Sequence, residues 1–383
     1  MYQFQFSLAE FMATHWHQSP TVIRQGLADF DDPIEPEEVA GLAMEADIDS
    51  RLVTQADGKW QVANGPFEHF DDFPETHAQL VVQAANHWHP GVRELADAFT
   101  SLPQWLFDDV MVCYSQPQGG VGPHIDQYDV FIVQGQGRRR WRVGPKGDYQ
   151  EANLDTGLKQ ITGFDAIIDV VLEPGDILYI PPGFPHEGDT LEPSLSYSIG
   201  YRSPKARELL SSYADQVIVD EAGDNHFHWP AMSAQPDAPA ALDPQHLAQM
   251  DEMMMALMHD EIRKKRWIGE FLSQARHELD LLSPDPQWQP DSLKAAMQDG
   301  LCLEKLSGLR AFYHADQPEM IFMLGESFDL PAGGCESLTP KLCNQRFIDW
   351  ETLGKAADNS LFWPMLTLWV NRGYWYPLEE APE

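Results

Sequence analysis

Residues 120–143 read GVGPHIDQYDVFIVQGQGRRRWRV, a strand-like run of Val, Ile and Phe with charged groups at both ends. Buried strands rarely carry charges that lack a partner or a function. His124 and Asp126 are two residues apart, and side chains at that spacing in a strand point the same way. One strand end can therefore present an imidazole and a carboxylate to a single point.

The segment lies within residues 108–201, where short apolar runs alternate with turns rich in Gly, Pro and Asp. Closely spaced strands without intervening helices predict a mainly β domain, either a sandwich or a double-stranded barrel. We therefore expect the catalytic part of the chain to be a β-barrel of the jelly-roll kind.

A third metal ligand is expected from the segment EPGDILYIPPGFPHEG, residues 173–188, in which a strand and a Pro-rich loop precede His186. Two histidines and one carboxylate, here His124, His186 and Asp126, leave about three positions open on a metal ion, as in non-heme Fe(II) oxygenases. Other His-x-acid pairs occur at residues 69–71 and 259–261, in a turn-like segment and in a predicted helix, where such residues do not share a face. The histidines interpreted as structural or surface residues are His15, His17, His87 and His89.

The arginine run suggests a cosubstrate. Oxygenases of this type commonly use 2-oxoglutarate, whose far carboxylate needs a cation inside the pocket, and a bidentate arginine suits it. Strand alternation puts Arg139 on one face with Trp141 and Val143, and the other three arginines on the opposite face. Arg139 is then the expected anchor. An irregularity within the run would make Arg140 the candidate instead, and the alternative is that all four arginines are solvated.

The composition narrows the partners. The 383 residues carry 60 acidic and 25 basic side chains, a formal net charge of −35, which argues against general nucleic-acid binding. The acidic surface would favour a basic partner through electrostatic steering. Solubility or a saline habitat explains the charge equally well. The four cysteines form no CxxC pair, so neither a disulfide framework nor a common zinc site is expected.

Three parts are expected along the chain. They are a catalytic domain over 1–204, a helical region over 205–282 and a small α+β domain over 283–383. A Pro- and Ala-rich linker is expected over 223–244, and a long helical stretch over 246–282 with a break near Asp260. We expect these helices to form a homodimer contact. The chain shows neither a signal peptide nor an apolar run of about 20 residues, which predicts a cytoplasmic protein with no membrane segment.

These motifs resemble the JmjC class of 2-oxoglutarate oxygenases in the cupin superfamily, and more closely its bacterial ribosomal oxygenases. The resemblance is carried by NHWH, residues 86–89, and by the two segments quoted above, and it weakens after residue 285. It implies Fe(II), 2-oxoglutarate and O2, and a C-terminal winged-helix-like domain that does not read DNA. It also implies that the substrate is an arginine of basic large-subunit ribosomal protein number sixteen, hydroxylated at the β carbon (position 3).

Four further residues complete the expected site. Cys113 and Ser196 are expected to line the cosubstrate pocket, while Tyr128 and Asp129 are offered as contacts for a substrate guanidinium. Three other functions stay open at this point: a JmjC demethylase, a non-oxygenase cupin metalloenzyme such as an isomerase, and a non-catalytic ribosome-assembly protein.

Overall fold

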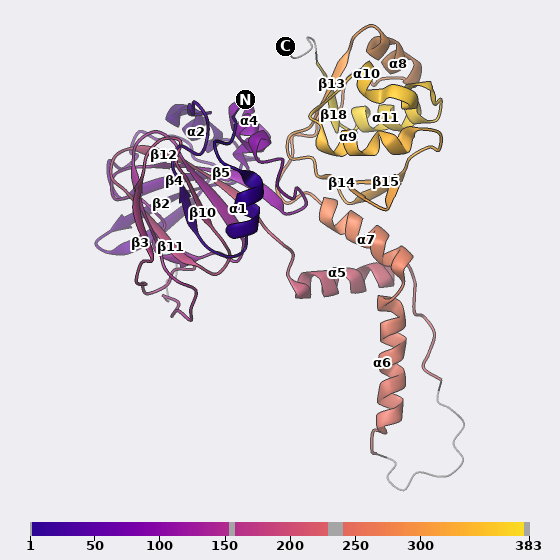
Figure 1. Ribbon diagram of the computed structural model, residues 1–383, viewed down its shortest axis with the longest axis horizontal. Helices are drawn as coiled ribbons and strands as arrows, with labels where there is room; N and C mark the ends of the chain where they lie inside the picture. Colours follow the sequence, from indigo (N-terminus) through magenta and orange to yellow (C-terminus); the bar gives the residue numbers. More distant parts are fainter. Residues whose placement is uncertain (1, 153–157, 229–239, 379–383) are drawn as a thin grey trace.

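The computed structural model describes residues 2–152, 158–228 and 240–378. It consists of a β-rich domain, a helical region and a C-terminal α+β domain, in the order expected (Figure 1). Within the described residues, no helix combines the length and the apolar character needed to cross a membrane.

The β-rich domain is built from two sheets that enclose a barrel. The larger sheet contains, in spatial order, β1 (Thr21–Ile23), β10 (Ile177–Ile180), β7 (Asp129–Gln134), β12 (Ser194–Tyr201), β5 (Phe107–Ser115), β4 (Ala78–Val82), β2 (Ser50–Ala56) and β3 (Lys59–Asn64). The smaller sheet contains β6 (His124–Ile125), β11 (Pro185–Thr190), β8 (Arg139–Val143) and β9 (Ile168–Leu172). All of these strand pairs are antiparallel.

The two faces of β7 show how the larger sheet divides the core. Phe131 and Val133 pack into the larger hydrophobic cluster, outside the barrel. The covering helices are α1 (Leu8–Thr14), α2 (Pro36–Leu42), α3 (Ala85–Trp88) and α4 (Pro90–Ala98). Val130 and Ile132 instead pack with Trp141 of the smaller sheet, inside the barrel. Because alternate residues face opposite sides, strand parity tells which side chains can reach the site.

Two details differ from the sequence-based expectation. Strands β2, β3 and β4 extend the larger sheet, although their residues were not predicted as strands. His186 follows the Pro-rich loop as expected but is the second residue of strand β11, which was not predicted as a strand. The loop residues before it are apolar, and β11 pairs on both sides, which draws His186 into the sheet.

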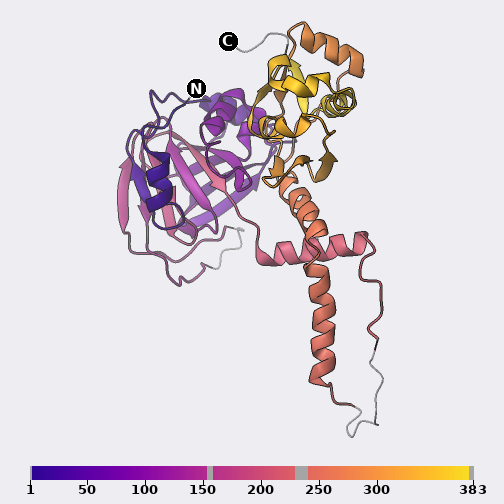
Figure 2. The same ribbon diagram turned by 45° about the vertical axis from the view of Figure 1, so that its right-hand side comes forward.

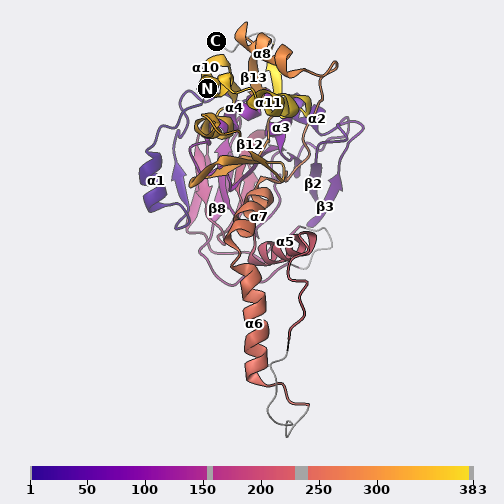
Figure 3. The same cartoon turned by 90° about the vertical axis from the view of Figure 1, so that its right-hand side faces the viewer.

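The helical region consists of α5 (Ala206–Val219), α6 (Pro244–Met258) and α7 (Glu261–Ser273). The predicted break is present, since the Asp260 side chain accepts a hydrogen bond from the Arg263 amide and caps α7. The helix ends at Ser273, nine residues before the expected end at residue 282. Half of the predicted linker, residues 229–239, lies outside the described residues. Helix α6 buries none of its residues and projects away from the rest of the molecule (Figures 1, 2 and 3).

The C-terminal domain combines helices with two three-stranded sheets. Its elements are α8 (Pro290–Gln298), β13 (Cys302–Lys305), β14 (Ala311–His314), β15 (Gln317–Met323), β16 (Glu326–Asp329), η1 (Cys335–Ser337), α9 (Thr339–Asn344), β17 (Phe347–Ile348), α10 (Trp350–Leu353), η2 (Gly354–Asp358), α11 (Phe362–Asn371) and β18 (Trp375–Leu378). The core contains the fully buried Trp369 and Trp375, whose ring centroids lie 5.7 Å apart. This packing gives the domain a hydrophobic core of its own.

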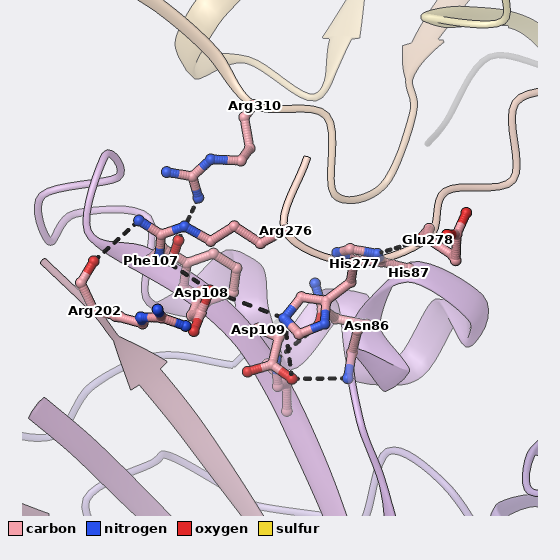
Figure 4. A network of polar contacts seen from close by, with 12 residues as sticks. Asn86, His87, Phe107, Asp108, Asp109, Arg202, Arg276, His277, Glu278 and Arg310 are labelled. Atoms are coloured by element: carbon pink, nitrogen blue, oxygen red, sulfur yellow. Dashed lines mark hydrogen bonds and ion pairs between the residues drawn. The ribbon is translucent and has the colours of Figure 1, made fainter. Parts of the chain in front are cut away.

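A polar junction connects the β-rich domain to the segment after α7 (Figure 4). Arg276 Nη1 lies 3.0 Å from Asp108 Oδ1 on β5. The Arg310 guanidinium donates to the carbonyls of Phe107 and Trp105, at 2.5 and 2.9 Å. These charge-assisted contacts attach the segment after α7 and the C-terminal domain to the start of β5 and the residues just before it.

His87 lies at the same junction and should make the stability of the folded protein sensitive to acid. Its Nδ1 lies 3.0 Å from the Glu278 carbonyl oxygen. The ring packs closely against Gly308, since a Cβ at that position would lie 2.3 Å from His87 Nε2. Burial, with smaller effects from His277 and Arg310, lowers the pKa of His87 to about 4. The unfolded chain binds a proton near the ordinary value of about 6.5, so this contribution to stability is complete above that pH and is lost as the pH falls toward 4.

We therefore expect the melting temperature of the wild type to fall more steeply between pH 6.5 and 4.5 than that of His87→Gln, with a difference in unfolding free energy of roughly 1–3 kcal/mol. Glutamine keeps a donor for the Glu278 carbonyl but has no titrating ring. Burial raises the pKa of Asp109 to about 6, so this carboxyl acts in the opposite sense and stabilises the folded protein as the pH falls. Because both proteins contain Asp109, its effect cancels in the comparison. If the melting temperatures of the two proteins fell equally steeply with pH, His87 would not be the source of the acid sensitivity.

Candidate active site

His124, Asp126 and His186 meet at one end of the barrel. His124 on β6 pairs directly with His186 on β11, and their ring centroids lie 4.3 Å apart. Asp126 Oδ2 lies 3.6 Å from Nε2 of His124 and 3.5 Å from Nε2 of His186. Two nitrogens and one oxygen therefore converge on one point, and the three residues form a group that could hold a metal ion.

The orientation of the rings suits metal binding. Nδ1 of His124 lies 3.0 Å from the Gly122 carbonyl, and Nδ1 of His186 lies 3.1 Å from the Phe184 carbonyl. A proton on each Nδ1 would be donated to these carbonyls and leave the Nε2 lone pair free for a metal. Burial alone would raise the pKa of Asp126, but the two histidines hold it well below its usual range, so the carboxylate is ionised.

A second group with metal-ligand chemistry, Asp108, Asp109 and His277, lies at the interdomain junction. Here Asp108 already pairs with Arg276, and Asp109 accepts a hydrogen bond from the Ala84 amide at 2.8 Å. A cation at this place would compete with an arginine that is already bound. The second group therefore belongs to the junction, and the barrel group is the candidate metal centre.

The arginines of β8 divide as strand alternation predicts. Arg139, Trp141 and Val143 are buried, whereas Arg140 is exposed and Arg142 is only partly buried. The three other arginines of the run form ion pairs near the surface. These pairs are Arg138 with Glu192, Arg140 with Asp169 and Arg142 with Glu187. No irregularity interrupts the pairing of β8 with β11.

Arg139 is a buried cation held only by neutral groups. It is 2% exposed, and its Nη1 donates to Ser196 Oγ at 3.0 Å. Its Nη2 donates to Gln79 Oε1 at 3.0 Å and to the Gly188 carbonyl at 3.3 Å. Over residues 2–152, 158–228 and 240–378, no carboxylate forms an ion pair with Arg139, and its buried Nε has no hydrogen-bond partner. A buried guanidinium in this state needs an anion, which a dicarboxylate cosubstrate would supply.

The expected pocket residues Cys113 and Ser196 lie together on the barrel face of the larger sheet. They pair across β5 and β12, and both are buried. Burial raises the pKa of the Cys113 thiol, although Arg139 acts to lower it, so the side chain is a neutral thiol. Tyr128 packs against the cluster inside the barrel, and burial together with Asp126 raises its pKa. Tyr128 therefore lies beside the metal group.

Asp129 does not lie where the sequence-based expectation placed it. It shares the outer face of β7 with Phe131 and Val133 and is only 1% exposed. Its Oδ1 accepts a hydrogen bond from the Tyr179 hydroxyl at 2.5 Å, and its Oδ2 lies 3.2 Å from His17 Nδ1. This carboxylate is not available to a docking substrate. The expectation considered only closeness to Asp126 in the sequence, but strand parity turns the side chain away.

Sequence reasoning also missed two polar residues inside the barrel, Gln79 and Arg51. Gln79 on β4 lies opposite Ser115 on β5, and Arg51 on β2 lies opposite Val81 on β4. Arg51 Nε is buried and has no hydrogen-bond partner among the described residues. Neither strand was predicted, so neither side chain could be assigned to the barrel interior.

Comparison with known proteins agrees with this geometry. A family model described as JmjC domain matches residues 94–209, and one described as ROXA-like winged helix matches residues 256–376. The ribosomal protein uL16 3-hydroxylase of Escherichia coli is 46% identical over 375 residues, covering 98% of this chain and 99% of that protein. This chain belongs to the JmjC ribosomal oxygenase family. A probable ribosomal oxygenase of Haemophilus influenzae is 30% identical and covers 91% of this chain and 89% of its own.

A solved member of the JmjC ribosomal oxygenase family is also similar in three dimensions. The structure of YcfD, a ribosomal oxygenase from Escherichia coli in complex with cobalt and 2-oxoglutarate, superposes with a TM-score of 0.91 at 45% identity. The superposition covers 98% of this chain and 99% of that one. Both the JmjC fold and the winged-helix domain expected from the sequence are thus confirmed.

Proposed function

We propose that this JmjC ribosomal oxygenase is a 2-oxoglutarate-dependent dioxygenase that hydroxylates an arginine of ribosomal protein uL16, the large-subunit protein number sixteen, at position 3. The observation that carries the proposal is Arg139, a buried cation without a described carboxylate partner in the same barrel as a two-histidine, one-carboxylate group. The 46% identity to the Escherichia coli uL16 3-hydroxylase supports the choice of substrate.

The residues of the barrel fit the groups that this chemistry needs. His124, Asp126 and His186 would hold Fe(II), and Arg139 with Ser196 would hold the far carboxylate of 2-oxoglutarate. The bound iron would supply the activation of O2 that ends in substrate hydroxylation, succinate and CO2. The span is suitable, because Arg139 reaches the Gly188 carbonyl, two residues or roughly 7 Å along β11 from His186.

The protein itself positions and encloses the reactants. Trp141 stacks on Arg139, with the guanidinium carbon 4.9 Å from the ring centroid, and Cys113 lies opposite Ser196 on the barrel face of the larger sheet. Such apolar walls exclude water and strengthen the charge interaction with the cosubstrate. Tyr128, beside Asp126, stays the candidate for contact with the substrate guanidinium.

The direct test uses mass spectrometry of ribosomal proteins from cells with and without the gene. We expect one basic protein, uL16, to lose a modification of about +16 Da, and purified enzyme to restore it on a uL16 fragment only when Fe(II), 2-oxoglutarate and O2 are present. A demethylase would instead release formaldehyde from a methylated peptide. An isomerase would not consume 2-oxoglutarate, and a non-catalytic assembly factor would tolerate His124→Ala.

We further propose that a second copy of the chain covers helix α6. Its exposed apolar residues Leu247, Met250 and Met254 recur at helical spacing and are 48, 42 and 60% exposed. Neighbouring apolar residues Ile218 and Ile262 are also exposed. An apolar surface of this kind on a projecting helix is typical of an interface between subunits.

We expect the wild type to have the mass of a dimer in light scattering, and Met250→Glu with Met254→Glu to shift it to the monomer because two charges would be buried. The matched control is Asp251→Asn with Glu252→Gln, exposed polar positions of the same helix, which should leave the dimer intact. A monomeric wild type would refute the proposal.

The remaining expectations are retained as proposals. The division at residues 204 and 282 separates catalytic, helical and winged-helix parts. The net charge of −35 supports a winged helix that does not bind DNA and a basic protein substrate. Modification of a ribosomal protein supports a cytoplasmic site of action.

A further inference from the structure

Gln79 is the side chain that connects Arg139 to the larger sheet. It is 3% exposed, and its Oε1 accepts hydrogen bonds from Arg139 Nη2 and from Ser115 Oγ, both at 3.0 Å. Its Nε2 lies 3.5 Å from Cys113 Sγ. A guanidinium can only donate, so the atom that faces Arg139 Nη2 is the amide oxygen, and this fixes the orientation of the Gln79 side chain.

The charge of residue 79 matters more than its size. An amide oxygen orients the guanidinium but leaves its positive charge uncompensated. A carboxylate of the same shape would form a charge-assisted pair with Arg139 and neutralise its positive charge before the cosubstrate binds. Arg139 forms no ion pair with a described carboxylate, although Asp189 acts on it electrostatically from farther away, so its charge stays available to an anion in the barrel.

We propose that Gln79 is a positioning residue that aims Arg139 into the barrel and, by being neutral, reserves its charge for the far carboxylate of 2-oxoglutarate. This inference rests on the proposed function, because it assumes that Arg139 holds this carboxylate. Ser115, which is fully buried and pairs with Gln79 across β4 and β5, holds the amide in place. Gly188 leaves room for the arrangement, since a Cβ there would lie 2.9 Å from Arg139 Nη2.

The test compares Gln79→Glu with Gln79→Met, two side chains of similar length. Affinity for 2-oxoglutarate is measured without O2 on the full chain loaded with Mn(II), by calorimetry and by tryptophan fluorescence. We expect Gln79→Glu to weaken binding by about 100-fold or more, and Gln79→Met by only about 5- to 20-fold. Affinity for Mn(II) alone should stay within about threefold of the wild type, because residue 79 is not among the three metal-binding side chains.

A second ligand separates a charge effect from a packing effect. 2-Oxopentanoate has the same 2-oxo acid end but a methyl group in place of the far carboxylate, so its weak binding should not fall in Gln79→Glu. Equal losses in the Glu and Met variants, equal losses for both ligands, or wild-type affinity in Gln79→Glu would each overturn the proposal. Should Gln79→Glu not fold, Ser115→Ala replaces it, with an expected loss of about two- to fivefold for 2-oxoglutarate alone; no loss would overturn the proposal.

The wild type distinguishes this inference from the proposed function. A wild type that binds 2-oxoglutarate and modifies uL16, while Gln79→Glu does the same with equal affinity, refutes the role of Gln79 only. A wild type that does not bind 2-oxoglutarate refutes the proposed function, and the role of Gln79 with it.

Discussion

Replacing Asp126 with alanine is expected to abolish hydroxylation and to weaken metal binding by more than about 100-fold. Loss of a residue that merely orients a metal ligand costs about 10- to 100-fold, so loss of the ligand itself should exceed that range. Asp126 is also the only carboxylate of the group, and its removal leaves two neutral imidazoles to hold a divalent ion. Calorimetry with Mn(II) and the uL16 mass shift measure the two effects independently.

The matched control is Asp129→Asn, three residues further along the chain. Asp129 faces the opposite side of β7 and bonds to Tyr179 and His17, so this variant should lose stability but keep Mn(II) affinity within about threefold. A large loss of metal affinity in Asp129→Asn, or full activity in Asp126→Ala, would contradict the assignment of the metal group.

The second large effect is expected for Arg139→Met, which should weaken 2-oxoglutarate binding by roughly 100-fold or more. Breaking a buried charge pair costs about 3–5 kcal/mol, and each 1.4 kcal/mol corresponds to a factor of ten. Methionine preserves much of the buried apolar volume between Trp141 and Cys113 but cannot pair with a carboxylate. Anaerobic binding of 2-oxoglutarate to the Mn(II) form is the measurement.

Arg138→Met, just before β8, and Arg140→Met, within it, are the controls. Both arginines pair with exposed carboxylates, Glu192 and Asp169, and exposed pairs contribute about 0–1 kcal/mol. Affinity for 2-oxoglutarate should therefore stay near the wild-type value in both. If Arg140→Met had the larger effect, the alternation that selects Arg139 would be the wrong basis for the assignment.

Local sequence patterns were sufficient to predict a structural feature where a residue's neighbours along the chain determine its environment. The parity of β8 separates Arg139 from the three surface arginines, and Asp260 marks the break between α6 and α7. Both features depend on the backbone geometry of a few consecutive residues. Asp129 was offered as a substrate contact because it follows Asp126 closely in the sequence, and strand parity, which turns its side chain away from the barrel, was not applied to it.

Contacts between distant strands could not be derived in this way. Gln79 meets Arg139 across 60 positions of the chain, and His124 meets His186 across 62. The junction of His87 with the Glu278 carbonyl spans 191 positions and two domains. The periodicity of one segment does not predict which strand will pair with it, because strand pairing depends on how the two sheets close into a barrel.

The sequence by itself predicted the types of chemistry in this protein: two histidines and an aspartate that could hold a metal, one inward arginine proposed to hold an anion, and a helical region proposed as a dimer contact. These follow from side-chain chemistry and from the fixed periods of strand and helix. Only the tertiary structure decided that Gln79 accepts a hydrogen bond from Arg139, that Asp129 faces away from the site and that Asp108 of the second group pairs with Arg276. The reason is that burial and pairing arise when separate segments pack together, and a side chain's role depends on which partners that packing supplies.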